Sequence, residues 1–81
     1  MKPEEIEKLL KLRPFEPFVI RFSDGRHVTI KHPESMALHR NKCEIGTLLR
    51  EGSLILDKAE FYSYLHIVSL EILRPQVNEN A

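Results

Sequence analysis

Apolar and polar residues alternate along much of this chain, and a period of two is typical of strands with one buried face. The pattern is clearest on both sides of Ser23-Asp24-Gly25, where the apolar positions are Phe18, Ile20, Phe22, Val28 and Ile30. Opposite residues of an antiparallel pair share a face. A three-residue loop at 23–25 opposes apolar to apolar, whereas a two-residue turn at Asp24-Gly25 mixes apolar and polar residues on both faces. We therefore predict a hairpin of strands 17–22 and 26–32, with a positive φ at Gly25.

The pattern predicts a second hairpin after a break at Pro33, which has no N–H to donate to a ladder. Its strands are expected at 36–40 and 43–48. A two-residue turn at Asn41-Lys42 would join them and place Leu38 opposite Ile45 and Met36 opposite Thr47. Whether residues 49–58 form an ordered segment or a loop stays open at this point.

The C-terminal part predicts the last strands, at 61–64 and 68–73, separated by a tight turn at 65–67. At the other end of the chain, residues 3–12 have helical spacing, with Ile6, Leu9 and Leu10 in one apolar stripe. Proline suits the first position of such a helix, and the Arg13-Pro14 step should end it.

One helix followed by about five short antiparallel strands, with a tight turn before the last, is the layout of the SH3-like and Sm-like small barrels. We therefore predict an α+β fold in which an N-terminal helix packs on a bent antiparallel sheet of about five strands. The domain is expected to cover residues 1–74 and to be followed by a disordered tail at 75–81. This comparison concerns the fold and implies no function.

Composition narrows the function classes. The chain has 81 residues and a net charge of zero with neutral histidines, which argues against a large phosphate-binding surface. A domain of this size buries only about 60% of its unfolded surface, so a partner subunit would add useful core. The single cysteine, Cys43, allows no intrachain disulfide and indicates the cytoplasm. We expect no membrane association, because no segment is long and apolar enough to span a bilayer.

Cysteine and histidine are the candidate nucleophile and metal ligands. Zinc sites in small domains usually pair their ligands at short spacing, and Cys43 with four scattered histidines lacks that pairing. We read Cys43 as a small, partly buried strand residue, since no base lies beside it in the sequence. His27 and His39 should be solvated, and His32 should point to the core side. The sequence thus predicts no enzyme, no cofactor and no metal site.

Tyr62 and Tyr64 share one face of the predicted strand, and two interpretations stay open. An exposed pair could stack on nucleobases together with a histidine, while nearby arginines contact phosphates. The residues of such a binding site would be Tyr62, Tyr64, His66, Arg21, Arg26 and Arg40. Alternatively, both rings pack under the helix or in a subunit interface with their hydroxyls in solvent, and this second interpretation is the favoured one.

Two resemblances accompany these patterns. Arg13-Pro14-Phe15-Glu16-Pro17-Phe18, Ser23-Asp24-Gly25-Arg26, His32-Pro33-Glu34 and the later Leu65-His66-Ile67 together resemble a group of short uncharacterised bacterial proteins. This resemblance covers residues 3–73 and implies a stand-alone small domain, without an activity. The segment 64–69 is similar to the second motif of the bacterial Sm-like RNA chaperones, with Leu65 in place of their basic residue.

These observations predict a non-enzymatic module that self-associates or binds a protein through an open strand edge or an aromatic face. A homo-oligomer or a protein partner is expected. The alternative is an Sm-like binder of RNA or single-stranded nucleic acid, which is not favoured because of the balanced charge.

Overall fold

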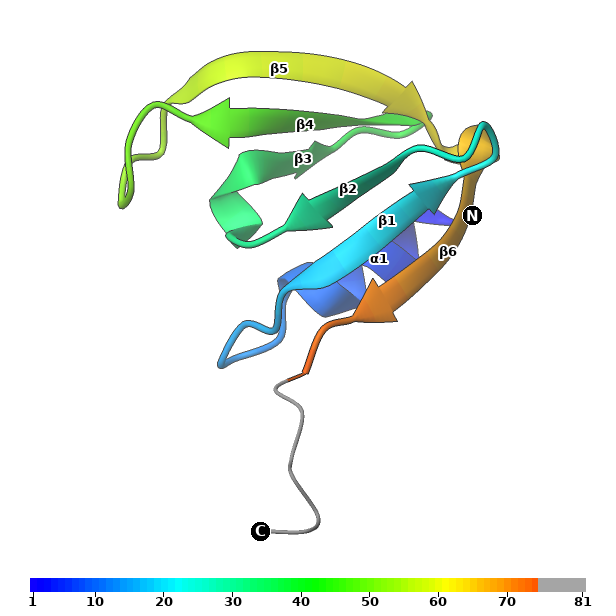
Figure 1. The fold of residues 1–81 in the computed structure, drawn as a ribbon, viewed down its shortest axis with the longest axis horizontal. Helices are drawn as coiled ribbons and strands as arrows, with labels where there is room; N and C mark the ends of the chain where they lie inside the picture. The colour runs from blue at the N-terminus through cyan, green and yellow to red at the C-terminus, as the bar shows by residue number, and fades with distance from the viewer. Residues whose placement is uncertain (75–81) are drawn as a thin grey trace, which may run out of the picture.

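The computed structural model describes residues 1–74 as an α+β fold, with one N-terminal helix and six strands in two antiparallel three-stranded sheets (Figure 1). The first sheet has the strand order β2-β1-β6, and the second has the order β3-β4-β5. The elements are α1 (Pro3–Leu10), β1 (Phe18–Phe22), β2 (His27–Ile30), the 3₁₀ turn η1 (Pro33–Ser35), β3 (Met36–Leu38), β4 (Lys42–Leu48), β5 (Leu56–Ser63), the 3₁₀ turn η2 (Tyr64–His66) and β6 (Ile67–Ile72). The predicted tail at 75–81 lies outside the described residues.

The helix α1 begins at Pro3 as predicted, and the Lys2 N–H donates to Glu5 Oε2 (3.2 Å) at its start. It ends at Leu10, two residues before the predicted end, and the Arg13 guanidinium donates to the free carbonyl oxygens of Leu10 (2.9 Å) and Leu12 (2.7 Å). Its Ile6 side chain is fully buried, which contributes about 1.5–3 kcal/mol to stability. An aspartate at this position would undock the helix.

The predicted β1–β2 hairpin is confirmed. Phe18 pairs with Ile30 and Ile20 pairs with Val28, as the alternation requires. The Phe22 N–H donates to Arg26 O (2.9 Å), which leaves a three-residue loop in which Gly25 has a φ of 91°. β1 is the central strand of the first sheet, and for that reason it is buried at every position except Arg21.

The β3–β4 hairpin is confirmed, but its predicted register is wrong. The His39 N–H donates to Lys42 O (2.9 Å), so the turn is Arg40-Asn41, and Met36 lies opposite Ile45. The observed register differs from the predicted one by two residues. A shift of two keeps every side chain on its own face, so alternation cannot distinguish the two registers.

Residues 49–55 connect β4 to β5, and β5 begins at Leu56, so the last part of the segment left open above is strand. The Leu49 N–H donates to Ile55 O (2.8 Å) and extends the ladder beyond the strands. The tip of this hairpin projects past the rest of the fold (Figure 1). We call residues 49–55 the hairpin tip.

The predicted helix and antiparallel strands are confirmed, but the single sheet of about five strands is wrong. Within residues 1–74, no strand pair joins the two sheets, and no closed barrel is present. The reason is local. Pro33 has no N–H and starts η1 between β2 and β3, and the Ser63 hydroxyl accepts the Leu65 N–H (3.2 Å) to start η2 between β5 and β6.

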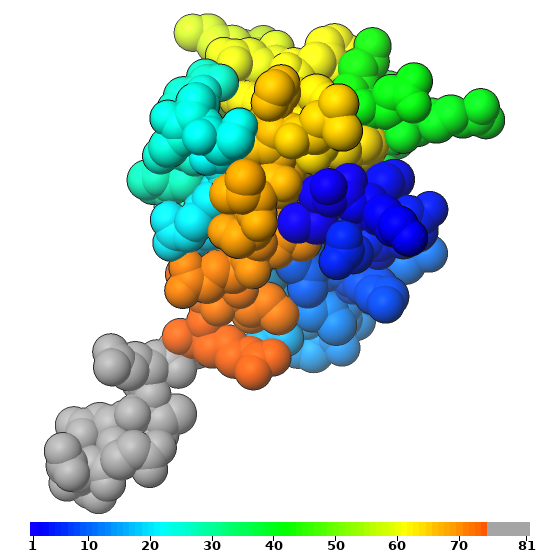
Figure 2. All heavy atoms as spheres, turned by 90° about the vertical axis from the view of Figure 1, so that its right-hand side faces the viewer, coloured from blue at the N-terminus to red at the C-terminus, as the bar shows by residue number. Residues whose placement is uncertain are grey.

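One hydrophobic core connects the helix with both sheets. Its buried residues are Ile6, Phe18, Ile20, Phe22, Ile30, Met36, Cys43, Ile45, Tyr64 and Ile67. The N-terminus lies against η2, where the Met1 ammonium group is 3.5 Å from Tyr64 O, and Figure 2 shows the first residues beside the corner between β5 and β6. The two sheets are thus held together by side-chain packing and by η1 and η2.

Candidate functional site

The side of β5 that faces away from β4 is the first candidate site, and we call it the β5 edge. β5 ends the second sheet, and among residues 1–74 it pairs only with β4 (Figure 1). Its five middle residues, 57–61, are all exposed. A long strand with exposed side chains and one unpaired side is a template for another strand.

The β3–β4 turn fixes the direction of the backbone groups in the second sheet. Because the His39 N–H donates to Lys42 O, the backbone of Lys42 points toward β3. Backbone direction alternates along a strand, so the N–H and C=O groups of Ile45 point toward β5, where Ile45 lies opposite Glu60. The N–H and C=O groups of Glu60 therefore point toward β4.

The backbone groups of the two residues next to Glu60 in the chain point away from β4. The N–H and C=O groups of Ala59 and Phe61 face the β5 edge, with no strand of residues 1–74 to receive them. The side chains alternate as well. Lys58 and Glu60 lie on the face where Ile45 is buried, and Phe61 lies on the opposite face.

Exposed apolar side chains flank the β5 edge at both ends. In the hairpin tip, Leu54 is 79% exposed and Ile55 is 58% exposed. At the other end, Phe61 is 56% exposed and Leu65, in η2, is 87% exposed. The Lys42 ammonium group lies 4.8 Å from the centre of the Phe61 ring and partly covers it.

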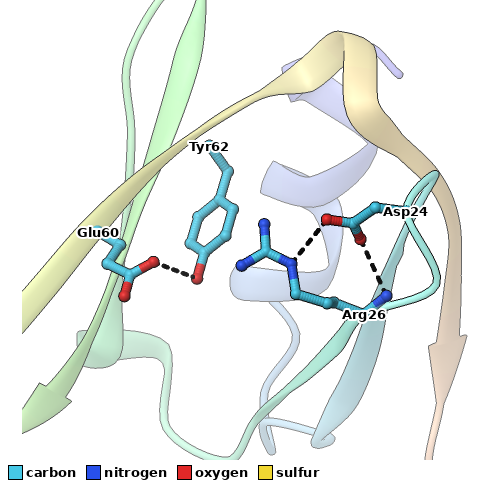
Figure 3. A network of polar contacts seen from close by, with 4 residues as sticks. All are labelled: Asp24, Arg26, Glu60 and Tyr62. Carbon is cyan, nitrogen blue, oxygen red and sulfur yellow. Dashed lines mark hydrogen bonds and ion pairs between the residues drawn. The ribbon is translucent and has the colours of Figure 1, made fainter.

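A polar network beside β5 is the second candidate site (Figure 3). Asp24 accepts the Arg26 backbone N–H at Oδ1 (2.9 Å) and the Arg26 Nε–H at Oδ2 (2.7 Å). The Arg26 guanidinium lies 5.9 Å from the centre of the Tyr62 ring, and the Tyr62 hydroxyl donates to Glu60 Oε2 (3.2 Å). The network connects the β1–β2 loop of the first sheet to β5 of the second.

The pKa values in this network follow from its contacts. The Arg26 backbone N–H, followed by its guanidinium, lowers the pKa of Asp24. Burial, followed by the hydrogen bond to Glu60, raises the pKa of Tyr62. Asp24 is therefore charged and Tyr62 neutral near pH 7. The charge of Arg26 is balanced within the network, so these groups suit a contact between the two sheets better than general acid–base catalysis.

A pocket of about 500 Å³ opens over this network. Its lining residues are Phe22, Ser23, Asp24, Arg26, Phe61, Tyr62, Ser63 and His66. The Ser23 N–H donates to His66 O (2.7 Å), which holds the β1–β2 loop against η2 and closes one side of the pocket. The Tyr62 ring also stacks on Phe22, with 4.7 Å between ring centres.

The structure brings three of the predicted binding residues together and separates the other three. Arg26, Tyr62 and His66 line this pocket. Tyr64 is only 5% exposed and its hydroxyl donates to His39 O (2.6 Å), so its ring offers no surface to a base.

Arg21 and Arg40 lie away from the lining of this pocket. The Arg21 guanidinium is bound to the Glu71 carboxylate (2.8 Å) across β1 and β6. Arg40 is exposed in the β3–β4 turn. The six predicted residues therefore do not form one site.

The cysteine and histidine positions are mostly as predicted. Cys43 is fully buried, and this burial raises the pKa of its thiol to about 11, so the thiol is protonated at neutral pH. His27 and His39 are exposed, as expected. His32 was expected on the core side but is exposed, because β2 ends at Ile30 and the alternation does not reach it.

Other features of residues 1–74 add no further candidate. No group of three or more histidine, cysteine, aspartate and glutamate side chains in this part of the chain is arranged to hold a metal ion. No helix described here has the length and apolar character needed to cross a membrane. Comparisons with protein-family models, with curated proteins and with solved structures found no match.

The β5 edge was missed in the sequence analysis. Residues 57–60 read Asp-Lys-Ala-Glu, which has no apolar alternation because both faces of this stretch are exposed. The sequence carries no signal for this strand. Only the fold shows that this charged stretch pairs with β4.

Proposed function

We propose that the protein is a non-enzymatic module that self-associates or binds another protein through the β5 edge. The observation that carries this proposal is the outward direction of the Ala59 and Phe61 backbone groups on a strand whose other side is already paired. An added strand would receive these groups at almost no conformational cost, because β5 is held extended by β4. The exposed apolar residues at both ends of β5 would gain cover at the same time.

The arrangement of the strands supports an open small barrel of the SH3-like and Sm-like type. η1 connects β2 to β3 at one corner, and η2 connects β5 to β6 at another, so two turns join the two sheets without closing them, within residues 1–74, into a barrel. A bacterial, cytoplasmic setting remains our expectation, in keeping with a free and buried Cys43.

Amide hydrogen exchange tests whether the β5 edge is open. In dilute protein, the Ala59 and Phe61 amides should exchange fast, and the Glu60 amide, bonded to β4, should exchange slowly. At high concentration, the Ala59 and Phe61 amides should become protected. Equal protection of the three amides in dilute protein would show that the edge is closed, and the proposal would then be wrong.

The alternative, an Sm-like nucleic-acid binder, is supported by the convergence of Arg26, Tyr62 and His66 on one pocket. It is the weaker proposal, because Arg26 is already paired with Asp24 and the net charge is zero. Protein purified without nuclease distinguishes the two. A high ratio of absorbance at 260 nm to 280 nm that falls in the variant Arg26→Ala would favour nucleic acid.

A further inference from the structure

We propose that the partner of the β5 edge is the β5 edge of a second copy of this chain, in an antiparallel pair about a two-fold axis at Ala59. This inference rests on the proposed association through β5 and assigns its partner, orientation and register. Two-fold dimers are the commonest oligomers, and one patch then serves both subunits. The joined sheet would have the strand order β3-β4-β5-β5-β4-β3, and six strands are a usual size.

Backbone direction limits the registers that are available. Two residues that lie opposite each other in the new pair must both have their backbone groups pointing outward, or both inward. Odd-numbered residues of β5 can therefore lie opposite only odd-numbered residues of the second copy. With Ala59 opposite Ala59 of the second copy, the two alanines exchange a pair of backbone hydrogen bonds. Their small side chains leave room for close approach at the axis.

Charge selects this register among those that remain. Lys58 of each copy lies opposite Glu60 of the other, so the strand pair contains two attractive lysine–glutamate pairs. Moving the second copy by two residues in one direction would oppose Lys58 to Lys58, and in the other direction Glu60 to Glu60. Opposed like charges destabilise a strand pair, so both of these registers are disfavoured.

The side chains are placed to form these ion pairs. Lys58 and Glu60 lie on the same face of β5 and are exposed. Among residues 1–74, Lys58 has no carboxylate within 4.0 Å. The Tyr62 hydroxyl donates to Glu60 Oε2 (3.2 Å), which leaves Oε1 for a partner (Figure 3).

The antiparallel arrangement also accounts for the apolar residues at the two ends of β5. It brings the hairpin tip of one copy, with Leu54 and Ile55, to the η2 end of the other, where Leu65 is exposed. Burial of these side chains would add apolar contact on each side of the central ion pairs. With a net charge of zero, two copies approach without overall repulsion.

Charge reversal at single positions tests the register by sedimentation over a range of concentrations. Wild type should approach twice the 9.5 kDa of the chain. Lys58→Glu and Glu60→Lys should each weaken association by about tenfold or more, because each replaces two attractive pairs by two repulsive ones. An equimolar mixture of the two variants should recover association, because each lysine again meets a glutamate. Glu34→Lys, an equal charge change at an exposed position in η1, outside the proposed contact, is the matched control and should associate like wild type.

Three outcomes decide the inference, and they are separate from failure of the proposed function. Loss in both variants with recovery in the mixture supports the register. Association that both charge reversals leave unchanged, but that Ala59→Pro abolishes and Ala59→Val retains, overturns the register and keeps the β5 edge as an interface. A wild type that is monomeric at every concentration overturns the dimer, and hydrogen exchange then shows whether the edge is open to a different protein.

Discussion

Gly46 lets β4 and β5 approach closely, and replacing it by alanine should displace the β5 edge. A Cβ atom at position 46 would lie 2.6 Å from Lys58 O and 2.9 Å from Leu56 Cδ2. Ordinary contact at such a carbon begins at 3.4 Å. The first of these atoms belongs to the backbone and cannot rotate away, so β5 itself must move by several tenths of an ångström. The φ of Gly46 lies outside the positive range, so the cost comes from this contact alone.

The net magnitude follows from two opposing effects. Overpacking of this kind typically costs about 1–3 kcal/mol. Alanine loses less chain entropy on folding than glycine, which offsets about 0.5–1 kcal/mol. The midpoints of these two ranges leave a net cost of about 1 kcal/mol for Gly46→Ala, and its Tm should fall by about 4–8 °C for a domain of this size.

Far-ultraviolet circular dichroism during urea unfolding measures this change, with Thr47→Ala as the control. Thr47 is an exposed neighbour on β4 with no such contact, so its variant should differ from wild type by less than about 0.5 kcal/mol beyond the loss of strand propensity. The amides of β5 should also exchange faster in Gly46→Ala than in the control. A Gly46→Ala protein as stable as wild type would refute the reasoning, because the two strands would then be free to separate.

The remaining predictions concern single contacts elsewhere in the fold. Gly25→Ala should cost about 1–2 kcal/mol in urea unfolding through its φ of 91° alone, since nothing lies within 4 Å of the added carbon, and Gly25→Asn should cost less. Because the pKa of Asp24 is below its ordinary 3.8, the folded state binds fewer protons than the unfolded state near that pH. Wild type should therefore be more stable than Asp24→Asn at neutral pH, and the difference should vanish as the pH falls through the lowered pKa. Cys43 should react with a thiol reagent only after unfolding, and fast labelling of native protein would contradict its burial. Its raised pKa of about 11 also predicts that stability falls as the pH rises from the ordinary thiol pKa of 9.0 toward 11. Tyr64→Phe should lose about 1 kcal/mol with the hydrogen bond to His39 O, and an unchanged Tm would show that this bond contributes nothing.

The sequence predicted features that depend on neighbouring residues and on the alternation of side chains between the two faces of a strand. The β1–β2 register followed from matching apolar faces across a loop that ends in glycine, and both are confirmed. The β3–β4 register could not be predicted, because the turns Asn41-Lys42 and Arg40-Asn41 give the same faces. Alternation in the sequence decides on which face of the sheet a side chain lies. Only the hydrogen bonds of the folded chain decide which residues of two strands lie opposite each other.

The candidate sites depended on the fold far more than the hairpins did. Tyr62 and Tyr64 have the same parity, yet η2 turns the chain between them, so Tyr64 is buried while Tyr62 joins Arg26 in the pocket. His66 reaches that pocket through a hydrogen bond to Ser23, which is 43 positions earlier in the printed sequence.

The sequence by itself determined the helix, the strand-rich middle and the positive φ at Gly25, because each of these depends on residues within a few positions of one another. Tertiary structure alone decided that the strands divide into two sheets, that Cys43 is buried in the core and that β5 has one unpaired side among residues 1–74. A strand lies at the edge of a sheet when no other strand, here among residues 1–74, pairs with one of its sides. Whether another strand does so depends on how the whole described chain packs.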